Sequence, residues 1–383
     1  MRGFVAMRRA AVVAVLLLAG CGNPFAWFFR SPPPPPAPLQ PIEHPISVRV
    51  LWQTRIGRAG EAVFTPAVAA DSVFAAAQDG TVVRVESATG HELWRVTVPG
   101  PLSGGVGTDG RLVVVGSAEG EVIALDGDGR MLWRARASSE ILSAPVVADD
   151  LVFVRSADSR VFAFDARDGR RRWLYQRAAP PLAVRSPAGI VVRSNYVFAG
   201  FSGGKLVALA LANGGLRWEG TVSLPKGTTE LERVTDVIGL PWIGDRDACA
   251  VAFQGRVACF DLGNGQAIWG RDLSSTTGLG VEGRYVYVSE DRGAVAALDR
   301  ATGTSLWRQD KLTNRQLSAP LPLGAEIAVG DLQGNVHVLA RENGAFVGRF
   351  ATDGSPIRAP PVAMANGFLV QTVSGGLYAL STH

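Results

Sequence analysis

Residues 151–176 read LVFVRSADSRVFAFDARDGRRRWLYQ, and this stretch decides the fold. It contains three apolar runs, at 151–154, 161–164 and 172–175, which are rich in β-branched and aromatic residues. Asp-Ser and Asp-Gly pairs separate the runs and favour tight turns. A shorter apolar run, at 146–147, precedes the stretch. Four short strands joined by turns, without helical periodicity, are typical of one blade of a β-propeller.

The same pattern recurs along the chain at intervals of about 40 residues. In most repeats a Gly lies four residues before a Trp, and an acidic residue lies shortly before that Gly. One further repeat keeps its Gly at position 344 but has Gly348 in the place of the Trp. A period of this length predicts a propeller or a solenoid, with the large indoles packed between neighbouring repeats. The repeat tryptophans are Trp52, Trp94, Trp133, Trp173, Trp218, Trp269 and Trp307, and the glycines before them are Gly90, Gly129, Gly169, Gly214, Gly265 and Gly303.

The repeats predict an all-β fold, an eight-bladed β-propeller of four-stranded antiparallel blades. Seven blades lie within residues 61–350, and residues 357–380 supply three strands of an eighth. The segment 48–52 reads as a fourth strand without its first three. Because joining these two ends leaves no incomplete blade, we expect the N-terminal strand to complete the last blade and close the ring. The propeller domain is predicted to span residues 47–383.

Residues 1–20 have the layout of a secretory signal peptide, with a basic start and an apolar run that is too short to span a bilayer comfortably. The motif Leu-Ala-Gly-Cys at 18–21 resembles the lipobox of bacterial lipoproteins. That resemblance implies cleavage before Cys21, lipidation of its sulfur and acylation of its new amine, so that acyl chains hold the protein at a membrane. Gly22 rather than Asp follows, and by the sorting rule of such lipoproteins this implies the periplasmic face of the outer membrane.

Residues 21–46 are predicted to be the lipidated Cys followed by a Pro-rich tether. The segment 31–38 favours polyproline II and cannot form a packed core. A ligand for a proline-binding domain is the alternative to a spacer. The full chain has a formal net charge of +4, and residues 1–20 hold three arginines and no acidic residue, which leaves about +1. This balance gives no reason to expect a nucleic-acid partner.

Several strings in the chain resemble enzyme motifs, but the repeat explains them. Residues 105–110 and 278–283 match G-x-G-x-x-G, and residues 200–204 match G-x-S-x-G. A dinucleotide site and a nucleophile elbow both need a helix after the motif, whereas apolar strands follow here. The four histidines are scattered, and no Cys or His pair has zinc spacing. We therefore expect no metal, no cofactor and no catalytic site.

Two cysteines besides Cys21 flank a predicted turn. Cys249 and Cys259 lie on either side of Gln254-Gly255, so we expect them on adjacent strands of one hairpin. In an oxidising compartment a disulfide between them and two buried free thiols fit the sequence equally well.

The motif Ala-x-Asp-x-x-x-Gly-x-x-x-Trp, as in 163–173 and 297–307, resembles the blade motif of quinoprotein propellers over residues 48–380. One family with this motif, the PQQ-dependent dehydrogenases, has an adjacent Cys-Cys disulfide and a calcium site. This chain has no adjacent cysteines and little length for the insertions that build such a site. A quinoprotein dehydrogenase is therefore an alternative, as is a generic periplasmic propeller adaptor with an unrelated partner.

The chain more closely resembles the BamB family, lipoproteins of the outer-membrane β-barrel assembly (Bam) machinery, in lipobox, tether, eight blades and length. Residues 181–185 are similar to that family's exposed Leu-x-Leu-Arg loop, and residues 229–237 to its Thr-Glu-Ile-Asp-Arg-Leu-Ser-Asp-Val segment. Ile238 stands where the family pattern has a second acidic residue.

The resemblance implies a non-enzymatic scaffold that binds periplasmic domains of BamA and other Bam members and assists insertion of β-barrel proteins into the outer membrane. Unfolded outer-membrane proteins are further partners that it suggests. The two longest Trp separations, 45 and 51 residues, fall where the two family segments lie, which favours binding loops there. The contact residues carried over from the family are Leu182, Val184, Arg185 and Asp236.

Overall fold

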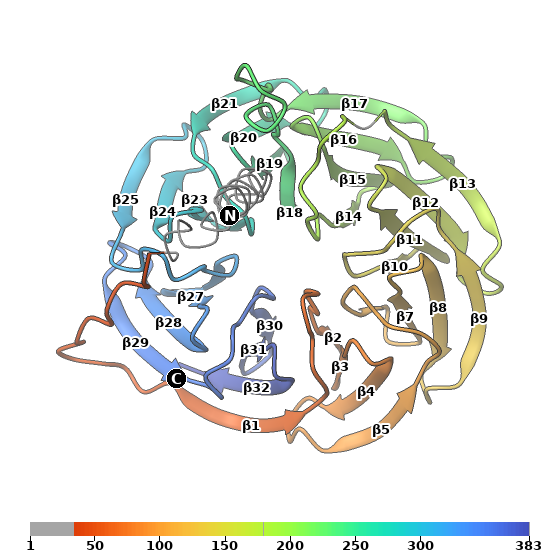
Figure 1. Ribbon diagram of the computed structural model, residues 1–383, viewed down its shortest axis with the longest axis horizontal. Coiled ribbons are helices and arrows are strands. Elements are labelled where there is room, and N and C mark those ends of the chain that lie inside the picture. The colour runs from red at the N-terminus through yellow and green to blue at the C-terminus, as the bar shows by residue number, and fades with distance from the viewer. Residues whose placement is uncertain (1–33, 179, 383) are drawn as a thin grey trace, which may run out of the picture. The chain divides into compact units, whose positions relative to one another are not determined.

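The computed structural model describes residues 34–178 and 180–382 of the chain. Within these residues 32 strands form eight four-stranded antiparallel sheets, which are arranged around a ring. Figure 1 shows each sheet as a blade whose first strand lies at the centre of the ring and whose last strand lies at the rim. The predicted eight-bladed β-propeller is confirmed.

The first four blades follow one another in sequence from residue 67 to residue 221, with the strand order of each sheet equal to its order in the chain. Blade 1 contains β2 (Ala67–Ala69), β3 (Ser72–Ala76), β4 (Thr81–Glu86) and β5 (Glu92–Thr97); blade 2 contains β6 (Gly107–Thr108), β7 (Leu112–Gly116), β8 (Glu121–Asp126) and β9 (Met131–Arg136). Blade 3 contains β10 (Val146–Ala148), β11 (Leu151–Ser156), β12 (Arg160–Asp165) and β13 (Arg171–Gln176); blade 4 contains β14 (Ile190–Arg193), β15 (Tyr196–Phe201), β16 (Lys205–Ala210) and β17 (Leu216–Thr221).

The last four blades continue this order up to the ring closure. Blade 5 contains β18 (Val237–Ile243), β19 (Asp247–Ala252), β20 (Arg256–Asp261) and β21 (Ala267–Asp272); blade 6 contains β22 (Leu279–Glu282), β23 (Tyr285–Ser289), β24 (Val295–Asp299) and β25 (Ser305–Gln309). Blade 7 contains β26 (Leu321–Leu323), β27 (Glu326–Gly330), β28 (Asn335–Ala340) and β29 (Phe346–Ala351); blade 8 contains β30 (Val362–Met364), β31 (Gly367–Gln371), β32 (Gly376–Ser381) and β1 (Arg49–Arg55).

The N-terminal strand closes the ring as predicted. In blade 8 the strand order is β30-β31-β32-β1, and Arg49 pairs with Ser381 at one end of the β1–β32 ladder. The cluster around Trp52 joins residues of blade 8 to residues of blade 1. Both chain ends of the propeller are therefore tied into the same blade.

The middle strands of each blade are buried because neighbouring blades cover both of their faces. β7 and β3 are buried along their whole length, and their sequences are continuous apolar runs. The outer strands are mostly exposed, and in β13 Trp173 is the buried exception. Each hydrophobic cluster joins two adjacent blades, as where Phe74 of blade 1 packs with Val113 of blade 2.

The Trp and Gly residues of the repeat form the contact between neighbouring blades. The indole Nε1 of Trp133 donates a hydrogen bond of 2.8 Å to the carbonyl of Ala166 in the next blade. Gly169 lies against this indole with a φ of +72°, and a Cβ there would lie 2.6 Å from the ring. Only Gly can adopt this positive φ without strain and also leave room for the indole. The same bond, at 2.6–2.8 Å, is made by Trp52, Trp94, Trp173, Trp218, Trp269 and Trp307.

The strings that resemble enzyme motifs form turns between strands. Residues 200–204 lie at the β15–β16 turn, and residues 278–283 span β22 and the turn into β23. Within the described part of the chain no helix is long and apolar enough to cross a membrane. The predicted signal peptide, Cys21 and residues 22–33 of the predicted tether lie outside the described residues.

Candidate functional site

All connections from an outer strand to the inner strand of the next blade leave from the same end of the blades, because every blade has the same strand order. They share one face of the ring, which we call the connection face. The opposite face, which carries the turns between third and fourth strands such as 211–215, we call the turn face. The segments 177–189, before β14, and 222–236, before β18, are two connections on the connection face.

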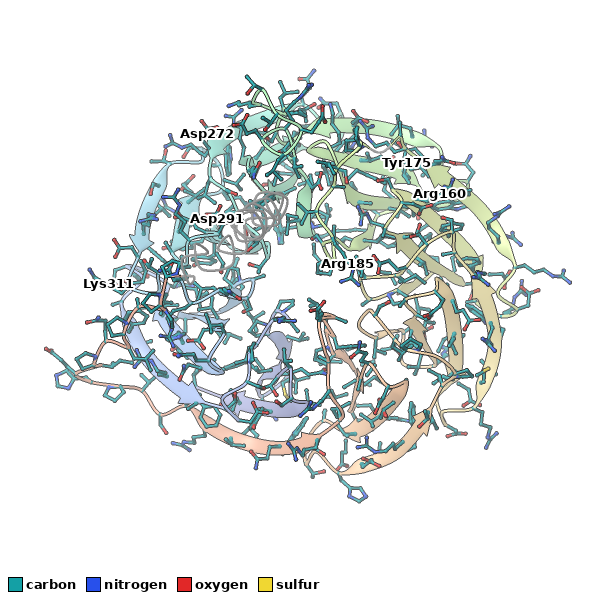
Figure 2. All side chains as sticks on the ribbon, viewed as in Figure 1. Arg160, Tyr175, Arg185, Asp272, Asp291 and Lys311 are labelled. Carbon is teal, nitrogen blue, oxygen red and sulfur yellow. A yellow bond between two sulfur atoms is a disulfide. The ribbon has the colours of Figure 1, made fainter. Side chains whose placement is uncertain are left out.

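Leu182 and Arg185 are two exposed residues of the first of these connections. The residue Leu182 is 47% exposed and Val184 is half-buried. The guanidinium of Arg185 binds the carboxylate of Glu140, with Nε 3.1 Å from Oε1 and Nη2 2.9 Å from Oε2. The hydrogen bond to Glu140 raises the pKa of Arg185. Figure 2 places Arg185 at the inner edge of the ring, where its half-exposed side chain is held in one orientation.

Asp236 has a different position from that expected of a contact residue. It is 3% exposed, and its carboxylate accepts hydrogen bonds from the backbone N–H of Val184 and from that of Gly203, the latter at 3.1 Å. Its own carbonyl accepts from Phe253 N at 2.8 Å. Asp236 therefore joins the two connections to the β15–β16 turn, and in this structure it positions the loop that carries Leu182.

A buried arginine that the sequence analysis missed lies beneath the first connection. Arg155 of β11 is 9% exposed, its Nη1 lies 3.4 Å from the carbonyl of Ala188, and its guanidinium lies over the ring of Phe201 at 5.5 Å. Burial lowers the pKa of Arg155 to about 10, while the charges of Asp236 and Asp158 oppose this shift. No sequence signal separates Arg155 from the many exposed arginines of the chain.

The second connection presents two exposed leucines. Leu224 and Leu231 are 62% and 69% exposed. The turn between them is held by Glu232, whose carboxylate accepts hydrogen bonds from the N–H groups of Thr228 and Thr229 at 2.9 and 3.1 Å. These bonds lower the pKa of Glu232. The loop is thus ordered by its own polar groups while its apolar groups face solvent.

Ile238, at the position of the missing acidic residue, is 1% exposed and pairs with Val251 of β19. An uncompensated carboxylate would be costly at this buried position. The absence of the second acid therefore agrees with the local packing of blade 5.

The first connection and strand β18 border an apolar cavity in the centre of the ring. Its volume is about 810 Å³, and Pro187 and Leu240 line it on the side of these connections. Further prolines, among them Pro145, Pro320 and Pro360, line it around the ring. Leu240 is half exposed although it lies in β18.

The two remaining predicted residues lie in blade 5. Cys249 of β19 and Cys259 of β20 face each other across the ladder, are fully buried, and are joined by a disulfide with a Cα–Cα distance of 4.1 Å. In the part of the chain that the structure describes, no three His, Cys, Asp or Glu side chains form a group that could hold a metal ion.

The sequence and its fold match one family over most of the chain. Residues 78–309 and 292–383 match the family model described as outer membrane protein assembly factor BamB. A Bordetella pertussis protein of that name is 41% identical over 374 residues, which cover 96% of each chain. The chain belongs to the BamB family. A relative of the same name from Nitrosomonas eutropha is 43% identical, with 87% of this chain and 82% of the relative covered.

Solved structures agree with this membership. BamB from Moraxella catarrhalis superimposes with a TM-score of 0.81 at 28% identity, covering 88% of this chain and all of that one. A quinohemoprotein alcohol dehydrogenase from Pseudomonas putida superimposes with a TM-score of 0.66 at 12% identity, covering 88% of this chain and 76% of the enzyme. The likeness to the dehydrogenase shows a shared propeller fold and nothing about activity.

Proposed function

We propose that the chain is a non-enzymatic lipoprotein scaffold of β-barrel assembly at the outer membrane. Cys21 carries the lipid that holds it to the periplasmic face of that membrane. The propeller binds periplasmic domains of BamA through the connections 177–189 and 222–236, and so assists the insertion of β-barrel proteins.

The observation that carries this proposal is the fixed presentation of Leu182. An apolar side chain at a loop tip is ordinarily mobile, but here Asp236 and Glu140 hold the two residues that follow closely after Leu182, namely Val184 and Arg185. A preorganised apolar anchor beside a charged group is the arrangement of a protein–protein hot spot. Val184 contributes a half-buried apolar surface next to it, and Asp236 supports the loop from beneath without touching the partner.

The proposal is tested by the Arg185→Glu variant in cells. The substitution reverses the charge next to Leu182 and places a second carboxylate beside Glu140, so we expect BamA to be lost from material extracted in mild detergent. Arg170→Glu, on the turn face and with a largely exposed side chain, is the matched control. Undiminished BamA with Arg185→Glu would refute the assignment, and a different major partner would favour the generic adaptor.

A second way of acting, direct capture of unfolded strands, is favoured by the outer edges of the blades. The outer strands β5, β9, β13, β17, β21 and β25 are each paired on one side within their sheets. They also carry exposed apolar residues, among them Leu93, Leu132 and Ile268. Such edges can accept an extended client strand by β-augmentation. Crosslinks from Leu132→Cys to nascent outer-membrane proteins support this, and crosslinks to BamA alone contradict it.

The enzyme alternative is tested by adding PQQ and calcium to the purified chain. We expect no visible absorbance band from bound cofactor, and a stoichiometric band would overturn the non-enzymatic assignment.

A further inference from the structure

The contact between blades 7 and 8 departs from the repeat. Gly348 stands where the Trp of blade 7 would lie, and Val48, four residues before Trp52, stands where the Gly of blade 8 would lie. At this contact the small residue therefore lies at the Trp position and the larger residue at the Gly position. A Cβ on Gly348 would lie 3.1 Å from Val48 Cγ2 and 3.1 Å from Ile46 Cγ1. The space that an indole fills elsewhere is occupied here by the segment that precedes β1.

Residues 37–48, which we call the strap, lie along blade 7. The N–H of Ala37 donates to the carbonyl of Thr313 at 2.9 Å, and the N–H of Ile46 donates to that of Val347 at 2.7 Å. Between these ends, Arg349 Nη2 donates to the carbonyl of Gln40 at 3.0 Å. The strap is therefore bound at both ends and in the middle.

The end of the strap at Ala37 is held by a buried charge. Arg315 is 1% exposed, and its Nη1 donates to the carbonyl of Ala37 at 2.6 Å. Its Nε binds the buried carboxylate of Asp331 at 2.7 Å, and its Nη2 binds Gln333 Oε1 at the same distance. A guanidinium held by two partners has little freedom left, so the position of Ala37 is fixed by the core of blade 7.

The topology places Ala37 on the connection face. Thr313 and Arg315 lie in the segment between β25 and β26, which is an outer-to-inner connection like 177–189. From Ala37 the strap runs along the rim to Ile46 and then turns into β1. Figure 1 shows this red segment beside β25 and β29. The strap thus starts on the face that carries Leu182.

We propose that the bound strap turns the connection face of the propeller toward the lipid bilayer. The inference rests on the proposed lipid anchor at Cys21. Residues 21–36, which join the anchor to Ala37, span roughly 50 Å at about 3.1 Å per residue if extended. Their proline run favours a stiff spacer, so the fixed exit point at Ala37 biases the orientation of the whole ring. A partner on the connection face then lies between the propeller and the membrane.

The test measures the orientation of the lipidated full chain in vesicles that contain an acceptor-labelled lipid. Donor dyes are placed on the two faces of blade 4, at Lys226→Cys on the connection face and at Ala212→Cys on the turn face, both exposed. Energy transfer to the lipid should be higher from position 226. The strap variant Ala37→Pro, which removes the N–H that donates to Thr313 at the exit point, should reduce this difference, and the matched control Leu39→Pro, on an exposed neighbour, should keep it.

Two results would overturn the inference, and they are distinguishable. Equal transfer from both faces, or higher transfer from position 212, in a chain that floats with the vesicles contradicts the orientation and leaves the lipid anchor intact. A chain that does not float contradicts the anchor and the orientation together. Arg315→Lys, which keeps a charge beside Asp331 but loses the guanidinium fork that also binds Ala37, serves as a second strap variant if Ala37→Pro fails to fold.

Discussion

A single buried carboxylate, Asp236, connects the core of the propeller with its candidate docking loops. Its two oxygens bind backbone N–H groups that lie 52 and 33 residues away in the chain. Hydrogen bonds from backbone N–H groups to a carboxylate are stronger than neutral ones, and leaving such donors unpaired in a buried site is costly. We therefore expect Asp236 to affect partner binding indirectly, by fixing Val184 and its neighbours.

Asp236→Asn should loosen the first connection without unfolding the ring. The amide keeps one acceptor oxygen, but its NH₂ group would face an N–H donor, so we expect a loss of about 1–3 kcal/mol in stability. Hydrogen exchange of residues 181–188 should accelerate while that of β15 stays slow. Asp245→Asn, on an exposed carboxylate, is the control. Unchanged exchange in Asp236→Asn would show that the loop is held by other contacts.

His337 makes stability depend on pH. It is fully buried, and desolvation lowers its pKa from 6.5, with Arg349 and Arg315 adding to the shift against the opposing effect of Asp331. Below pH 6.5 the unfolded chain then binds a proton that the folded chain does not. Stability should fall on acidification, by at most about 1.4 kcal/mol per pH unit, down to the lowered pKa. Urea unfolding of His337→Gln should lack this component, whereas the exposed control His91→Gln should retain it.

At the scale of the element, the contact between blades is a Trp of one blade, its hydrogen-bonded carbonyl, and a Gly of the next. The sequence carries this contact in a local pattern of about ten residues, repeated along the chain. Because each blade contacts only its two neighbours, the local pattern was enough to predict the number of blades, the strands and the closure.

Gly303→Ala tests the steric part of this contact. Gly303 has a φ of +71°, and a Cβ would lie 2.4 Å from the indole of Trp269. The substitution should cost about 1 kcal/mol for the backbone and a further 1–3 kcal/mol for the overlap. Gly283, in the same blade, has a φ of +57° with no atom within 4 Å of such a Cβ, so Gly283→Ala should show the backbone cost alone. Equal losses of unfolding free energy would contradict the proposed packing.

The sequence predicted less of the candidate site than of the fold. The segments 181–185 and 229–237 were found through their resemblance to a family, and their exposure could not be derived from composition. The burial of Asp236 was not predicted because its partners are distant in sequence. Neither was the strap, since residues 37–46 read as a Pro-rich tether and their contacts with Arg315 and Arg349 are tertiary. The replacement of the repeat Trp by Gly348 was evident in the sequence. That Val48 compensates for it became clear only from the contact between blades 7 and 8.

At the scale of the whole molecule, the propeller is a rigid ring with its proposed binding groups on one face. Eight blades closed by β1 position 177–189 beside 222–236, and Pro187 of the first connection lines the central cavity. The strap exits on that same face at Ala37. A rigid ring of this kind holds the surfaces of these segments in a fixed relation to one another.

In the function proposed above, the connection face binds BamA through Leu182. The most direct measurement is the affinity of the detergent-solubilised full chain for purified BamA, compared between Leu182→Asp and Leu216→Asp. Both substitutions place a carboxylate on an exposed leucine, but Leu216 lies on the outer strand β17. We expect at least a roughly tenfold loss of affinity, or about 1.4 kcal/mol, for Leu182→Asp and none for Leu216→Asp. Equal affinities for Leu182→Asp and the unmodified chain would contradict it.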